Sequence, residues 1–128
     1  VLAGLACAIQ NTAAEVAEAT VQSLLRVVPA AVPGIAFLSG GQSGKQASRR
    51  LNAMHLRYDP PAEPHTSPGK CALPWPLSFS FGRAIQYPAL EIWAGKEANK
   101  AAAQRALLHR ARCNRAALQG DYTAEMEN

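Results

Sequence analysis

The sequence predicts an α/β fold in which parallel strands, buried on both faces, are covered by amphipathic helices. Helix-like and strand-like patterns alternate along the 128 residues, in the order helix, strand, helix, loop, strand, helix. Such alternation is typical of right-handed β-α-β units, whose strands run parallel. The composition agrees, because only 6% of the residues are aromatic and the 48% apolar content comes mainly from Ala, Leu and Val. This composition argues against an all-β sandwich.

The first helix is expected from about residue 13 to residue 28. Thr12 and Glu15 form a capping box, in which a hydroxyl and a carboxylate satisfy free backbone amides at a helix start. Apolar residues then recur at near-helical spacing as far as Pro29, where the helix must end because proline cannot donate the next backbone hydrogen bond.

A strand and a second helix are expected next. The run Ile35-Ala-Phe-Leu38 is apolar without alternation, as in a strand buried on both faces of a parallel sheet. It ends in Ser39-Gly40-Gly41. Ser43 and Gln46 offer a second capping box, which predicts a helix through Met54 with its arginines facing outward.

Residues 55–76 carry six prolines without periodicity and predict a long surface loop, which in a compact domain is either functional or disordered. The apolar run Leu77–Phe81 predicts a second buried strand, ending in Gly82-Arg83. Pro88 suits the first turn of a short helix that follows.

A long helix is then expected from about Glu97 to Gln119, with Gly120 as the residue that ends it. Its basic residues account for most of the net charge of +4, and we expect them mainly to form a solvated helix face. They are Lys96, Lys100, Arg105, Arg110, Arg112 and Arg115. The alternative is a basic module, residues 96–115, that binds nucleic acid or another polyanion, although it lacks interleaved aromatic residues.

Two strands alone cannot form a stable sheet, because both edges expose unpaired amides and carbonyls. A complete (β/α)8 barrel takes about 250 residues. We therefore expect residues 1–128 to be the carboxy-terminal part of a single barrel domain. The opening Val1–Ile9 is apolar but far shorter than the roughly 20 residues of a membrane span, and we expect it to continue from a preceding segment.

The two glycine-bearing turns after the predicted strands are the candidate ligand site. At Ser39-Gly40-Gly41 the missing side chains let backbone N–H groups approach a ligand, and the next helix adds its positive end. At Ser80, Gly82 and Arg83 another glycine lies beside a guanidinium that suits phosphate. Barrels often hold phosphate between the loops after strands 7 and 8. The alternative is a purely structural role, in which these glycines only allow the backbone to form tight turns.

Several other chemistries are not supported by the residue spacing. The string from Gly40 to Lys45 is not a nucleotide P-loop, since Ser39 stands where the first glycine is required and Gln46 follows the lysine. Three cysteines without CxxC spacing and three scattered histidines predict no metal site and a reducing compartment. No Ser-His-Asp set or paired-carboxylate pattern emerges.

Longer strings of this sequence resemble class I fructose-1,6-bisphosphate aldolases. The strings are Val27-Val-Pro-Ala-Ala-Val-Pro-Gly-Ile-Ala-Phe-Leu-Ser-Gly-Gly-Gln-Ser43, Leu51-Asn-Ala-Met54, Pro74-Trp75, Leu77-Ser-Phe-Ser-Phe-Gly-Arg-Ala84, Trp93-Ala-Gly-Lys-Glu-Ala-Asn99 and Ala102-Ala-Gln104. They occur in the order that the family uses and cover nearly everything outside the predicted loop.

The resemblance implies a cytoplasmic, homotetrameric TIM-barrel lyase of glycolysis. Such an enzyme cleaves fructose 1,6-bisphosphate reversibly into dihydroxyacetone phosphate and glyceraldehyde 3-phosphate through a lysine Schiff base, without metal or other cofactor. The family's lysine begins a Lys-Pro-Asn-Met-Val segment whose last valine matches Val1. The chain would thus contain strands 7 and 8 with their helices but no catalytic residue, and would be inactive alone.

By the same resemblance, Ser39, Gly40 and Gly41 match the family's strand 7 phosphate loop, and Ser80, Gly82 and Arg83 match the strand 8 contribution. They are expected to bind a sugar-phosphate substrate; nucleic acid and membranes are not expected partners. His55 departs from the asparagine that the family usually has. A non-catalytic aldolase-like scaffold remains the alternative within the family.

Overall fold

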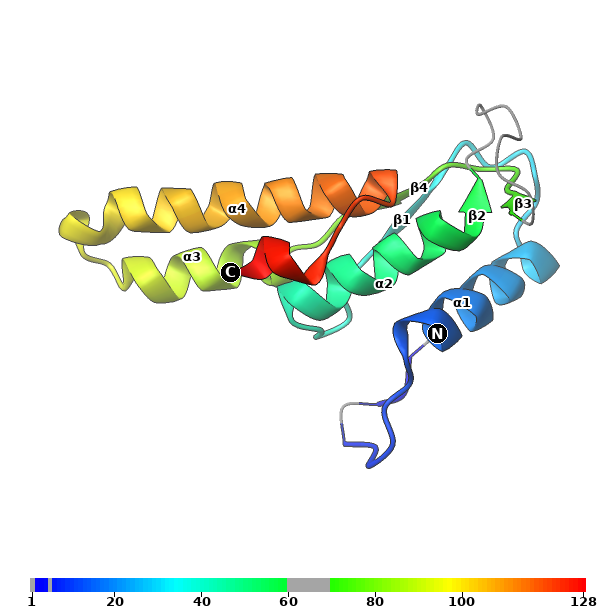
Figure 1. Ribbon diagram of the computed structural model, residues 1–128, viewed down its shortest axis with the longest axis horizontal. Coiled ribbons are helices and arrows are strands. Elements are labelled where there is room, and N and C mark those ends of the chain that lie inside the picture. The colour runs from blue at the N-terminus through cyan, green and yellow to red at the C-terminus, as the bar shows by residue number, and fades with distance from the viewer. Residues whose placement is uncertain (1, 5, 60–69) are drawn as a thin grey trace.

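The computed structural model describes residues 2–4, 6–59 and 70–128, and it has the predicted alternation of helices and strands (Figure 1). The elements are α1 (Ala13–Val27), β1 (Ile35–Phe37), α2 (Gly44–Arg57), β2 (Tyr58–Asp59), β3 (Cys71–Ala72), β4 (Leu77–Phe79), α3 (Arg83–Trp93), η1 (Glu97–Asn99), α4 (Lys100–Gln119) and η2 (Ala124–Glu127). No described helix is long and apolar enough to cross a membrane.

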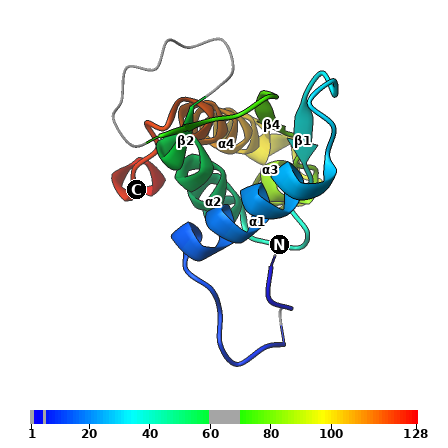
Figure 2. The same cartoon turned by 90° about the vertical axis from the view of Figure 1, so that its right-hand side faces the viewer.

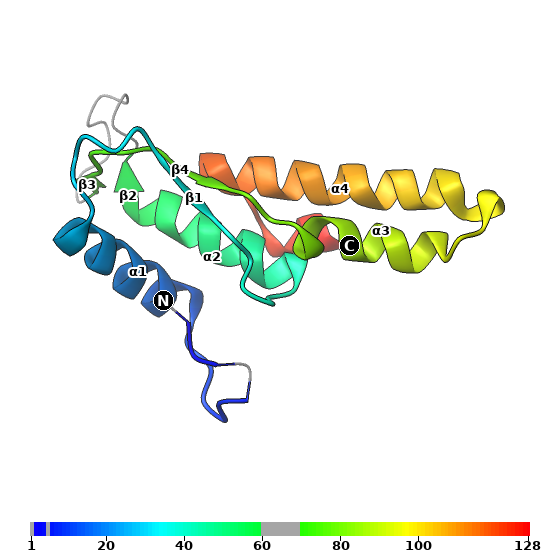
Figure 3. The same cartoon turned by 180° about the vertical axis from the view of Figure 1, so that it is seen from behind.

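The strands β1 and β4 pair in parallel, as the alternation predicted. The register places Ile35 opposite Leu77 and Phe37 opposite Phe79. Figure 3 shows the two strands running side by side past the helices. Because parallel strands end at the same edge of a sheet, the turns after β1 and β4 must lie near each other.

Both predicted capping boxes are present and fix the starts of α1 and α2. The Thr12 hydroxyl accepts from the Glu15 N–H, and the Glu15 carboxylate accepts from the Thr12 N–H at 2.8 Å. Ser43 and Gln46 make the equivalent pair at the start of α2. Helix α1 ends at Val27, one residue before the predicted end, and α2 continues three residues beyond Met54.

The prediction of one loop over residues 55–76 was partly wrong. Residues 55–57 are the last turn of α2, and β2 pairs with β3 in parallel, with Tyr58 opposite Cys71. Leu73 and Trp75 are buried, and the Trp75 indole donates to the Pro29 carbonyl at 3.1 Å. The proline-rich sequence did not predict these contacts, because the residues involved pack against parts of the chain that are distant in sequence. Residues 60–69 of the predicted loop lie outside the described residues.

Helix α3 begins earlier than predicted, at Arg83, so Pro88 lies inside the helix rather than in its first turn. The chain leaves β4 and enters the helix within a few residues, with Gly82 as the N-cap. Pro88 has no N–H to donate to the Ala84 carbonyl, four residues earlier. The helix nevertheless continues to Trp93, because its other turns retain their hydrogen bonds.

Helix α2 lies between two apolar clusters and contributes buried side chains to both. One cluster, between α1, α2 and the strands, consists of Ala17, Val21, Met54, Tyr58, Leu73, Trp75 and Leu77. The other, between α2, α4 and the carboxy-terminal segment, consists of Ala47, Leu51, Phe81, Ala84, Cys113, Ala117 and Tyr122. The predicted inner stripe of α2 is confirmed, since Ala47, Leu51 and Met54 are all buried.

The long pair α3 and α4 extends to one side of the strands, and α1 lies on the other side of α2 (Figure 1). Viewed from the end, residues 6–12 lead into α1 from outside the helices (Figure 2), whereas Leu2 lies against α1 and α2. The predicted end of α4 at Gly120 is confirmed, because this glycine has a φ of 76° and its N–H donates to the last turn of the helix.

Candidate phosphate-binding site

A pocket of about 480 Å³ lies between the turn after β1 and the start of α3, the helix that follows β4. It contains three of the six predicted site residues, namely Ser39, Gly41 and Arg83. The remaining lining residues are Gln42, Ser43, Gly44, Ala84, Tyr87, Pro88 and Glu91. The pocket thus joins the turn after β1, the first turn of α2 and the first turns of α3.

The turn after β1 has the backbone geometry that glycine provides. Gly40 and Gly41 both adopt left-handed conformations, with φ of 60° and 82°, which cost other residues roughly 1–2 kcal/mol. Among the described residues, no acceptor engages the N–H of either glycine. The N–H groups of Gly44 and Lys45, in the first turn of α2, also have no partner within their helix. This end of α2 therefore offers several free donors and the positive end of a helix dipole.

Gln42 and Arg50 hold this turn in place. The Gln42 side chain donates to the Ser39 carbonyl at 2.6 Å, and its oxygen accepts from Arg50 at 2.8 Å. The Gln42 backbone N–H donates to the same carbonyl at 3.1 Å. Sequence reasoning placed Arg50 on the outer face of α2 and missed this role, because its partner belongs to the irregular turn.

The structure places the other predicted residues outside the pocket lining. Gly40 and Ser80 are exposed, and the Ser80 N–H already donates to the Phe37 carbonyl at 2.8 Å. Gly82 has a φ of −86°, and a side chain added there would meet no atom within 4 Å. Space therefore does not require glycine at position 82, and its predicted role in ligand approach stays a prediction.

A buried polar network supports the start of α2 from behind. Arg110 donates to both Glu127 oxygens and, at 2.7 Å, to the Ser48 hydroxyl. The Ser48 hydroxyl contacts the Asn114 side-chain oxygen at 2.6 Å and the Gly44 carbonyl at 3.0 Å. The network thus runs from the carboxy-terminal segment to the first turn of α2.

Arg110 is the exception to the prediction that the basic residues near α4 mainly form a solvated face, which the others confirm. It is 5% exposed and pairs with Glu127, whereas Lys100, Arg105, Arg112 and Arg115 are exposed. Burial opposes ionisation of Glu127, but hydrogen bonds from Arg110 and Tyr122 bring the pKa of its carboxyl below the usual value. The charged pair is therefore a fixed part of the interior.

Two further features concern charge and metal ligands. Glu91 brings a negative charge to the pocket wall, so the positive character of the site comes from Arg83 and the backbone donors. A neighbouring pocket of about 530 Å³ includes Lys45, Arg105 and His109. His109 also belongs to a group of potential metal ligands with Cys113 and Glu127, which residue spacing does not reveal, because Glu127 comes from a separate segment of the chain.

Comparison with known proteins identifies one family. A family model described as fructose-bisphosphate aldolase class-I matches residues 1–128. Fructose-bisphosphate aldolase B of Gallus gallus is 50% identical over 122 residues, which are 95% of this chain and 30% of that protein. The aldolase B of Homo sapiens is 49% identical over 124 residues, with the same coverage. The chain thus spans about a third of the length of the curated relatives it matches.

A solved structure shows the same arrangement of elements. It is fructose-bisphosphate aldolase from Plasmodium falciparum in complex with TRAP and a small-molecule inhibitor. The TM-score is 0.78 and the sequence identity 42%, over 95% of this chain and 31% of that one. The sequence and structure comparisons therefore both match fructose-bisphosphate aldolases, over a similar share of their length.

Proposed function

Because this chain belongs to the class I fructose-bisphosphate aldolase family, we propose that it forms the phosphate-binding part of such an enzyme. Strands β1 and β4 would be strands 7 and 8 of a (β/α)8 barrel. The reaction is the reversible cleavage of fructose 1,6-bisphosphate into dihydroxyacetone phosphate and glyceraldehyde 3-phosphate. The lysine that forms the Schiff base would lie in the segment that precedes Val1.

The observation that carries the proposal is the shared pocket at the ends of two paired parallel strands. Ser39 and Gly41 reach it from the turn after β1, and Arg83 reaches it from the start of α3, just after the turn that follows β4. Free N–H groups, a helix amino terminus and a guanidinium are the donors that phosphate oxygens accept from. Their position at the carboxyl ends of barrel strands is where (β/α)8 enzymes bind substrates.

The role of this site in the reaction is positioning. A phosphate held between the Gly41 turn and Arg83 would fix the distance between the substrate carbonyl and the lysine amine. Holding reactants in this way converts much of the binding free energy into rate. None of Ser39, Gly41 and Arg83 is assigned a proton transfer in this proposal.

The edges of the small sheet fit a larger barrel. Among the described residues, β1 pairs only with β4, so the outer edge of each strand has unpaired backbone groups. In a complete barrel the neighbouring strands would satisfy these groups. We further propose that the full-length protein acts as a homotetramer in the cytoplasm, as the family resemblance implies.

The test is Arg83→Ala in the full-length enzyme. Hydrogen bonds to charged groups contribute about 1.5–3 kcal/mol, so kcat/KM for fructose 1,6-bisphosphate should fall roughly 10- to 100-fold. Arg112→Ala is the matched control, because Arg112 is exposed on α4 and lines neither pocket. Equal kinetics for the Arg83 variant and the wild type would show that Arg83 does not contribute to substrate binding.

The scaffold alternative makes a different prediction about the same full-length protein. A scaffold without the family lysine would not turn over fructose 1,6-bisphosphate, so Arg83→Ala could not reduce its activity. It could still bind the substrate. Borohydride reduction in the presence of dihydroxyacetone phosphate distinguishes the two cases. A covalent adduct shows that a Schiff base forms, and its absence leaves only the binding role.

A further inference from the structure

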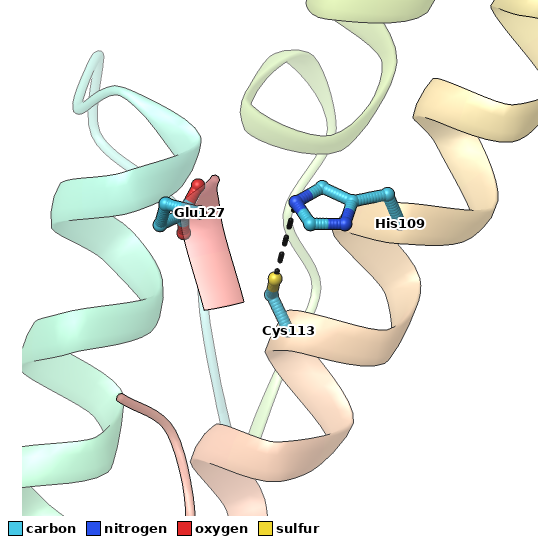
Figure 4. Close-up of side chains that lie close together, drawn as sticks. All are labelled: His109, Cys113 and Glu127. Atoms are coloured by element: carbon cyan, nitrogen blue, oxygen red, sulfur yellow. Dashed lines mark hydrogen bonds between the residues drawn. The ribbon is translucent and has the colours of Figure 1, made fainter. Parts of the chain in front are cut away.

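We propose that His109, Cys113 and Glu127 form a binding site for a single thiophilic transition-metal ion such as Zn²⁺. The ligand atoms of these three residues all lie within 4.8 Å of one another. Figure 4 shows the two α4 side chains on the same side of the helix, directed towards Glu127 in the carboxy-terminal η2 segment. The ion would thereby join the end of the chain to α4. It would not take part in the aldol reaction.

The two α4 ligands already have the separation that a metal requires. His109 and Cys113 are four residues apart, so they lie one turn apart on one face of the helix. Their Nε2 and Sγ atoms are 3.6 Å apart. Zinc bound tetrahedrally at about 2.0–2.1 Å from nitrogen and about 2.3 Å from sulfur separates these atoms by about 3.6 Å.

Glu127 is oriented by groups that are not ligands themselves. Its Oε1 accepts from the Tyr122 hydroxyl at 2.7 Å, and both of its oxygens accept from one Arg110 nitrogen. Metal-binding carboxylates are commonly held by hydrogen bonds of this kind. A carboxylate oxygen has two acceptor positions, so Oε2 keeps one position for an ion.

The types of ligand atom decide which ions fit. Mg²⁺ and Ca²⁺ need several oxygen ligands, whereas this group offers one carboxylate. A thiolate and an imidazole instead favour ions such as Zn²⁺ and Co²⁺. Lys45 and Arg105 line the same pocket as His109 and Glu127, and Arg110 already pairs with Glu127. These cations oppose any divalent ion, so the bonds to sulfur and nitrogen have to hold it.

An ion has a route to the group. His109 and Glu127 line the open pocket of about 530 Å³, whereas Cys113 lies behind them and is fully buried. A water molecule from this pocket can take the fourth position of a tetrahedral site. On binding, the Cys113 S–H bond breaks, its proton leaves to water, and the sulfur electron pair bonds to the ion.

The test is a titration of chelator-treated full-length protein with Co²⁺. We expect about one Co²⁺ bound per chain, with the near-ultraviolet charge-transfer band of a cobalt–thiolate bond. Cys113→Ser should abolish the band, and His109→Ala should weaken Co²⁺ binding at least 10-fold. Zn²⁺ should displace Co²⁺, whereas Mg²⁺ and Ca²⁺ should not.

Cys71→Ser is the matched control, because Cys71 is an exposed free cysteine in β3, and it should keep the band. Retained aldolase turnover in the Cys113 variant shows that this variant is folded, since Cys113 does not line the proposed phosphate pocket. A band that persists in Cys113→Ser, or the lack of any cobalt–thiolate band in wild-type protein, would overturn the proposal. If Cys113→Ser fails to fold, an unchanged Co²⁺ affinity in His109→Ala would do the same.

Discussion

The imidazole of His55, in the last turn of α2, is half-buried, and its Nε2 has no hydrogen-bond partner among the described residues. Burial lowers the pKa of this imidazole, and the charge of Lys70 lowers it further, against a hydrogen bond with the Leu77 backbone that raises it. The folded protein therefore holds His55 in its neutral form more firmly than the unfolded chain does.

The sign of the pH effect follows from this lowered pKa. The contribution of neutral His55 to the free energy of unfolding is fully present above the usual pKa of about 6.5. It is lost as the pH falls from there through the lower pKa of the folded state. Denaturant unfolding of the full-length protein between pH 7 and pH 5 should show this loss. The His55→Asn variant, whose side chain cannot be protonated, should lose less of its free energy of unfolding over this pH range. Equal losses in the variant and the wild type would contradict the expectation.

Residue patterns predicted three of the residues that line the pocket but not the residues that hold them in place. Ser39, Gly41 and Arg83 follow apolar runs, and position after a buried strand is visible in a sequence. The roles of Arg50 and Arg110 are not visible, because an arginine on a helix surface and one that meets a distant carboxylate have the same spacing. Glu127 lies in a short 3-10 segment without periodicity.

At the scale of the element, the two capping boxes offer a matched experiment. Both Thr12→Ala and Ser43→Ala remove a helix cap that contributes about 1 kcal/mol to stability. Of these two capped helices, α1 and α2, α2 is the one that begins at the proposed phosphate site. We therefore expect similar losses in the free energy of unfolding but an increase in KM for fructose 1,6-bisphosphate only in Ser43→Ala. Urea unfolding and steady-state kinetics of both full-length variants give the two numbers.

Equal kinetics in the two cap variants would show that the start of α2 does not contribute to phosphate binding. An increase in KM in both variants would show that KM follows general stability rather than the local donors. The Ser43 hydroxyl contacts the Gln46 N–H at 3.2 Å in the capping box, so its loss changes the first turn of α2 directly.

Long elements with caps were predicted to within a few residues, whereas contact-dependent features were not. The two capping boxes and Gly120 fixed three helix boundaries, since these signals are local. Pro88 misled the prediction of α3, because a proline inside a helix and one in its first turn look alike in sequence. The short strands β2 and β3 depend on pairing between segments that are distant in sequence, which local patterns do not reveal.

At the scale of the whole molecule, much apolar surface is left exposed. Several large apolar side chains are more than half exposed, namely Ile9, Val27, Leu38, Leu56, Tyr87, Leu90 and Leu108. Exposed apolar side chains in this number, together with open sheet edges, are normally covered by other parts of a protein. The proposal that these residues belong to a larger barrel gives this surface a partner.

The same surface predicts the behaviour of the 128 residues as an isolated chain. We expect this chain to aggregate or to be poorly structured, because the open edges of β1 and β4 have no covering strands. Thermal unfolding followed by circular dichroism, with light scattering to report association, checks the expectation. A soluble monomer with a cooperative melt would contradict it.

The claim on which the functional account depends is that the turns after β1 and β4 bind one phosphate group together. A double-mutant cycle with Ser39→Ala and Arg83→Ala, measured as kcat/KM for fructose 1,6-bisphosphate in the full-length enzyme, tests it most directly. Groups that share one ligand should be coupled by about 0.5 kcal/mol or more. Effects that add within about 0.3 kcal/mol, or no effect of either variant, would contradict the claim.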